Sequence, residues 1–167
     1  MECTFSKTLL ISLVLFIALS LQLKAQEPPP RPVVVNVTAQ TLSFGAFTHG
    51  AVGGTVSISS SGMRTATGDV ILLSMGYSFS TTLYEVIANP GTIISILNGP
   101  DVSLPGSNGG SITLTIGASD PASPFVTTTP PPLPTYLNIG GTISIGPSVA
   151  NPPGDYSGTY DITFVQQ

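Results

Sequence analysis

The chain has 167 residues and a formal net charge of −4, and only 7% of its residues are charged. Its four basic residues cannot form the basic patch that binds nucleic acid or an anionic lipid surface. Its single cysteine, Cys3, excludes an internal disulfide and a cysteine-based zinc site. Nucleic acid and charged membranes are therefore not expected partners.

Residues 1–25 have the pattern of a secretory signal peptide. Lys7 precedes an apolar run from 9 to 21, and small or polar residues follow it. The run is shorter than the roughly 20 residues that a membrane-spanning helix needs. We expect cleavage after Ala25, with Gln26 as the alternative. The mature chain would then lie in the periplasm, at the cell surface or outside the cell, without a membrane span.

The mature chain begins with a Pro-rich spacer at 26–32, and we expect 33–167 to form a single domain. Alternation of apolar and polar residues predicts a strand over 33–44. One face of this strand carries an apolar row: Val33, Val35, Val37 and Ala39.

Further strands are expected in the middle of the chain, where Gly-rich and Pro-rich turns separate apolar or alternating stretches. They cover residues 55–60, 70–73, 77–88, 92–97 and 111–116. The stretch 118–135 contains six prolines, which cannot donate to a sheet ladder. We therefore expect that stretch to be an exposed loop.

Two strands complete the chain. Residues 136–145 form the first, with a bulge or bend expected at the Gly140–Gly141 pair. Residues 155–165 form the last, after a Pro-Pro-Gly turn that ends at Gly154. Its apolar face carries Tyr156, Tyr160, Ile162 and Phe164.

No stretch after the predicted signal peptide shows a helical period. Seven to nine short strands separated by Gly and Pro are typical of a sandwich or a barrel. We therefore predict an all-β fold, an immunoglobulin-like antiparallel β-sandwich.

Residues that could carry catalysis or bind a metal are scarce. His49 is the only histidine, and the acidic residues occur singly along the chain. No sequence pattern combines a nucleophile with a base, or groups the ligands that a metal needs. The sequence thus indicates a protein that is not an enzyme and uses no cofactor or metal.

Five segments, in order, resemble the bacterial domain-of-unknown-function family 4402. They are Leu-Ser-Phe-Gly at 42–45, Gly-Thr-Val-Ser-Ile at 54–58, Gly-Met-Arg at 62–64, Leu-Asn-Ile-Gly-Gly-Thr-Ile at 137–143 and Pro-Gly-Asp-Tyr-Ser-Gly-Thr-Tyr-Asp-Ile-Thr-Phe at 153–164. The family is similar to spore coat protein U and to chaperone–usher pilins, whose immunoglobulin-like subunits polymerise by exchanging a strand.

The resemblance implies a secreted or surface structural subunit, pilin-like or coat-like. Its partners would be copies of itself or other extracellular subunits, and a periplasmic chaperone. Gly154 lies fourteenth from the end, as in pilins, but Gln166 stands where pilins carry a penultimate aromatic residue. The alternative is an adhesin domain for carbohydrate or protein, using exposed aromatics such as Phe125 and Tyr136.

The structural-subunit and the adhesin hypotheses both require a strand that covers the apolar row of the first strand. We expect the apolar row of 33–44 to lie beside the row of the C-terminal strand. Burial of three valines contributes about 5–9 kcal/mol before the entropy of ordering, at about 1.5–3 kcal/mol each. The first strand either completes its own domain or is donated to a neighbour.

Overall fold

The computed structural model describes residues 32–167, which form strands and their connections without a helix. Every strand pair is antiparallel. The all-β antiparallel prediction is confirmed. The predicted signal peptide and almost all of the Pro-rich spacer lie outside the described residues.

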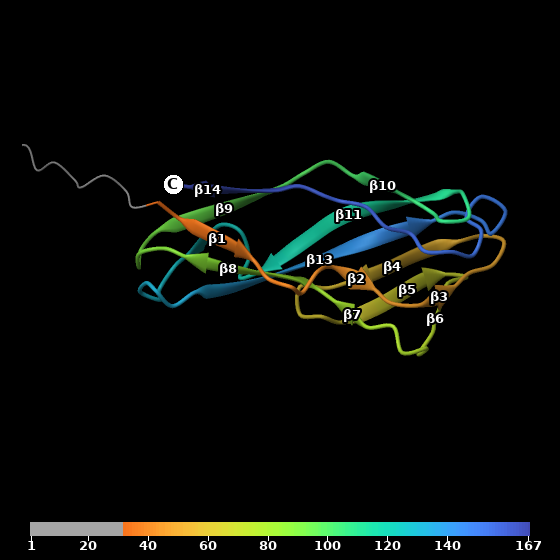
Figure 1. Cartoon of the computed structure of the whole chain (residues 1–167), viewed down its shortest axis with the longest axis horizontal. Coiled ribbons are helices and arrows are strands. Elements are labelled where there is room, and N and C mark those ends of the chain that lie inside the picture. Colours follow the sequence, from red (N-terminus) through yellow and green to blue (C-terminus); the bar gives the residue numbers. More distant parts are fainter. Residues whose placement is uncertain (1–31) are drawn as a thin grey trace, which may run out of the picture. The chain divides into compact units, whose positions relative to one another are not determined.

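The largest element is a seven-stranded sheet, called here the main sheet (Figure 1). Its central path runs in the order β1 (Val34–Val37), β8 (Thr82–Ile87), β13 (Thr135–Ile145), β11 (Ser111–Asp120) and β10 (Val102–Pro105). Strand β13 pairs with β8 along its first half. Along its second half it pairs with β4 (Gly54–Ile58), which in turn pairs with β5 (Arg64–Gly68).

A three-stranded sheet, called here the small sheet, packs against the main sheet. It consists of β12 (Phe125–Val126), β9 (Ile93–Asn98) and β14 (Ile162–Gln166). Two short ribbons add β2 (Ser43–Phe44) with β7 (Phe79–Ser80), and β3 (Phe47–Thr48) with β6 (Ile71–Leu72). The arrangement is sandwich-like.

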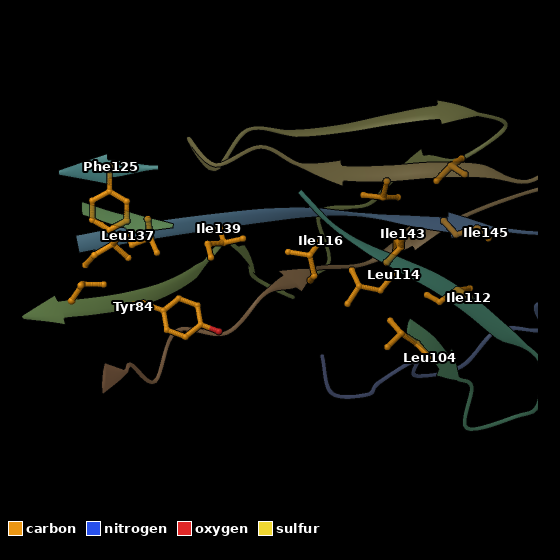
Figure 2. Packing of buried hydrophobic residues seen from close by; sticks show 14 of the residues in the cluster. Tyr84, Leu104, Ile112, Leu114, Ile116, Phe125, Leu137, Ile139, Ile143 and Ile145 are labelled. Carbon is orange, nitrogen blue, oxygen red and sulfur yellow. The ribbon is translucent and has the colours of Figure 1, made fainter. Parts of the chain in front are cut away.

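The core lies between the two sheets and consists of alternate residues of their strands (Figure 2). On β13 the side chains of Leu137, Ile139 and Ile143 are almost fully buried. Each contributes about 1.5–3 kcal/mol by leaving water. Figure 2 shows Phe125 of the small sheet above Leu137 of the main sheet, so the two sheets share one core.

Strand β13 continues through Gly140, at which it exchanges β8 for β4 as its neighbour. A Cβ on Gly140 would collide with the carbonyl oxygen of Ile58, so glycine is needed for this close approach. A bulge or bend is predicted at Gly140–Gly141, and the pairing of β13 with β11 is irregular there: β11 has an extra residue between Ile116 and Ser119. The bulge is therefore on β11 rather than on β13.

The expected loop over 118–135 is wrong in part. Strand β11 continues to Asp120, and β12 lies within the stretch and pairs with β9. Phe125 is consequently only 6% exposed. The prolines flank β12, so the strand keeps the backbone donors that it needs.

The expected buried strand over 70–73 is also shorter than predicted. Only Ile71–Leu72 forms a strand, and the Ile71 side chain is 62% exposed. Strand β6 pairs with β3 in a separate two-stranded ribbon, and the face of this ribbon that carries Ile71 is exposed to water.

Candidate functional site

The predicted apolar row of the first strand is half present. Val33 and Val35 are half-buried and pack against the core. Val37 is 70% exposed, and Ala39 is exposed beyond the end of β1. The chain bends after Val37 because the hydroxyl of Thr38 donates to the Leu83 carbonyl and accepts from the Gln40 backbone N–H.

The C-terminal row is present as predicted. Tyr156, Tyr160, Ile162 and Phe164 are half-buried and pack against the core. The residues between them are exposed. The strand itself is shorter than expected, since β14 starts at Ile162 and Tyr156 forms an isolated bridge with Gly106.

Gly154 does not join this row. It is exposed in the loop before the C-terminal segment, close to the Ser107 hydroxyl, which accepts a hydrogen bond from the Asp155 N–H. Its position therefore reflects a loop contact rather than the start of a pairing strand.

The first and last strands do not pair with each other, although Val33 and Val35 of the first row and Phe164 of the last line one pocket. Strand β1 pairs with β8 of the main sheet, and β14 pairs with β9 of the small sheet. The rings of Phe164 on β14 and Tyr84 on β8 meet edge to face, with 5.3 Å between their centroids. Each strand therefore forms one border of the sandwich.

The free edge of β14 can be located from its hydrogen bonds. The Gln167 N–H donates to the Ile93 carbonyl, and the Gly99 N–H donates to the Asp161 carbonyl. Hydrogen bonding alternates along an antiparallel pair, so the odd-numbered residues of β14 face β9. The backbone groups of Ile162, Phe164 and Gln166 then point to the other edge, where β14 has no neighbour within residues 32–167.

The edge of β1 is open in the same way. The Thr38 N–H donates to the Leu83 carbonyl, and the register pairs Asn36 with Glu85. The same alternation turns the backbone groups of Val35 and Val37 away from β8. Within the described part of the chain, β1 has β8 as its one neighbour.

Between these two edges lies a pocket of about 250 Å³, called here the edge pocket. It is lined by Val33, Val35, Ile94, Phe164 and Gln166. The edge pocket is partly open to solvent, and polar and apolar atoms line it in similar proportion, so it is a groove between the main and small sheets rather than a closed apolar cavity.

Sequence reasoning missed Ile94 and Tyr84 as parts of this region. Ile94 belongs to the strand predicted over 92–97, but no local pattern indicates that it lines a pocket with Val33. Tyr84 is buried beneath Phe164, and burial, together with Tyr160, raises its pKa to about 12. The Tyr84 phenol is buried because the two sheets pack against each other at this position.

The polar groups away from the edge pocket support turns. Oδ2 of Asp69 accepts a hydrogen bond from the Val52 N–H at 2.9 Å, which lowers the pKa of that carboxyl. Arg64 donates from Nη2 to the Ala46 carbonyl at 2.6 Å and lies over the ring of Phe79. These contacts attach the connecting loops to the main sheet.

His49, the only histidine in the sequence, lies just after β3, and its ring centroid is 6.5 Å from that of Phe47. Among residues 32–167, no three His, Cys, Asp or Glu side chains come together as a metal would require. In the same range, no helix is long and apolar enough to cross a membrane.

Comparison with known proteins gives one match. The profile of a family described as Domain of unknown function (DUF4402) matches residues 35–165. No curated protein and no solved structure is significantly similar to this chain.

Proposed function

The chain belongs to the DUF4402 family, and from this premise we propose that it is a structural subunit of a cell-surface or extracellular assembly, pilin-like or coat-like and without catalytic activity. The observation that carries the proposal is the pair of open strand edges, β1 and β14, with the edge pocket between them. Subunits would join through a strand added at this border.

An added strand has two sources of binding energy here. Its backbone would pair with the outward groups of Phe164 and Gln166 on β14, or with those of Val35 and Val37 on β1. Its alternate side chains would enter the edge pocket. Each large apolar side chain that becomes buried contributes about 1.5–3 kcal/mol, against the entropy of ordering the strand.

The composition of β14 supports the same reading. Proteins usually protect a free strand edge with a charge, a proline or a bulge. Residues 162–167 read Ile-Thr-Phe-Val-Gln-Gln and contain neither a charge nor a proline. An unprotected edge of this kind is expected where a partner strand covers it.

The test is assembly of the secreted protein, followed by light scattering over a range of concentrations and by electron microscopy. We expect oligomers or filaments, and fewer of them in Gln166→Pro, which removes an edge-facing N–H. The matched control is Gln166→Ala, which removes the same side chain and keeps the edge-facing N–H. A protein that stays monomeric at every concentration contradicts the proposal.

An adhesin domain is the second candidate, and the structure changes which residues it would use. Phe125 is buried, whereas Tyr136 is 56% exposed. The connection between β6 and β7 also exposes Met75 and Tyr77. Binding to a glycan array that is lost in Tyr77→Ala or Tyr136→Ala, with unfolding unchanged, would favour this candidate.

A further inference from the structure

The free edge of β14 differs from the other strand edges in residues 32–167. Strand β12 is flanked by Pro124, β10 ends in Pro105, and β5 starts with Arg64. Strand β1 follows Pro32. These residues discourage further pairing. Asp161 precedes β14, but Ile162–Gln166 itself contains no charge and no proline. The strands of the two short ribbons have two residues each, so β14, with five residues, has the longest edge of this kind in the described part of the chain.

The same edge is also complementary to itself. Two copies of β14 can run antiparallel with Phe164 opposite Phe164 of the second copy. Ile162 and Gln166 then lie opposite each other, and their outward backbone groups exchange two N–H···O bonds in each pair. Asp161 lies opposite Gln167, whose side chain is uncharged.

The side chains agree with this register. Thr163 and Val165 are on the outer face of the small sheet and would lie opposite each other, a pairing that suits β-branched residues. Ile162 and Phe164 keep their places in their own core, so self-pairing uses the backbone groups of the edge and the Thr163–Val165 contact rather than the edge pocket.

We propose that the partner of the β14 edge is the β14 edge of a second copy of this chain. The two small sheets then form one continuous sheet across a twofold axis at Phe164, a closed contact of the isologous type. This inference rests on the proposed function, and it names the partner that the structural subunit uses at this border.

Engineered cysteines test the register directly, in the full chain with Cys3→Ser. In the proposed register Thr163 and Val165 form a non-hydrogen-bonded pair, with Cα atoms about 4.5 Å apart. A disulfide needs about 4.4–6.8 Å between Cα atoms. Each residue is about 7–8 Å from its own equivalent in the second copy, a diagonal separation. The proposal thus expects cross-linked dimer when Thr163→Cys and Val165→Cys are mixed, and little from either alone.

Two proline variants provide an independent measurement by light scattering. Gln166→Pro removes an N–H from the β14 edge and should give a monomer, whereas Val37→Pro removes one from the β1 edge and should leave the dimer. Loss of the dimer in Val37→Pro alone would overturn the inference.

The outcomes separate this inference from the proposed function. Oligomers that form without the mixed cross-link would overturn β14 self-pairing and leave the structural subunit standing. A strictly monomeric protein, with neither oligomers nor cross-links, would overturn both.

Discussion

Replacement of neighbouring residues by proline should distinguish the two sides of β14. The Val165 N–H faces β9 opposite Ser95, whereas the Gln166 N–H faces the open edge. Val165→Pro removes a ladder bond and leaves the Ser95 carbonyl without its donor, which costs about 1–3 kcal/mol. Gln166→Pro loses no internal bond, so its free energy of unfolding should change by about 0.5 kcal/mol or less, as for other surface substitutions.

The assay is urea unfolding at a protein concentration that keeps the chain monomeric. Val165→Pro should lower the midpoint with an unchanged slope, and Gln166→Pro should match the wild type. Val165→Ala and Gln166→Ala control for loss of the side chains. Equal destabilisation by the two prolines, or a larger effect at Gln166, would refute the assignment of the open edge and with it both proposals.

Three other predictions address the corrected loop and an acid-sensitive turn. Phe125→Ala should lower the free energy of unfolding by about 3–5 kcal/mol, as for a buried aromatic. Tyr136→Ala should lower it by much less, because that side chain is exposed. Equal effects in urea unfolding would contradict the burial of Phe125 in the core. Thr127→Val should cost about 0.5–1.5 kcal/mol, because the hydroxyl of the buried Thr127 donates to the Asn89 carbonyl, which keeps the N–H and the hydroxyl of Thr92 as donors; a neutral result would show that the contact is dispensable. The Asp69 carboxyl has a lowered pKa in the folded state, so its contribution to folding stability is present above the unfolded pKa and is lost as the pH falls. Asp69→Asn should therefore flatten the acid side of the pH–stability curve. An unchanged curve would contradict this role of Asp69.

Local alternation predicted which residues face inward but not which strands meet. The C-terminal row from Tyr156 to Phe164 was predicted because every second residue is apolar, and that pattern depends on neighbours in sequence alone. The pairing of β14 with β9 depends on contacts between distant parts of the chain, so nothing near Phe164 indicates it. Phe125 was missed because its two-residue strand lies among prolines that dominate the local pattern.

The edge pocket was predictable only in part for the same reason. Val33 and Val35 were candidates from their alternation, and their inward direction is borne out. Val37 belongs to the same pattern but is 70% exposed at the end of β1, just before Thr38 turns the backbone. Gln166 also lines the pocket, and no pattern in the sequence indicates that role.

The position of Arg64 has a consequence for digestion by proteases that cleave after lysine or arginine. Beyond Arg31, Arg64 is the only such residue in the sequence. It starts β5, pairs there with Ile58, and its guanidinium is held by Ala46 and Phe79. Cleavage after it requires local unfolding of a paired strand rather than access to an exposed loop. A trypsin-like protease therefore meets a domain with one cleavage site, and that site is protected for as long as β5 stays in the main sheet.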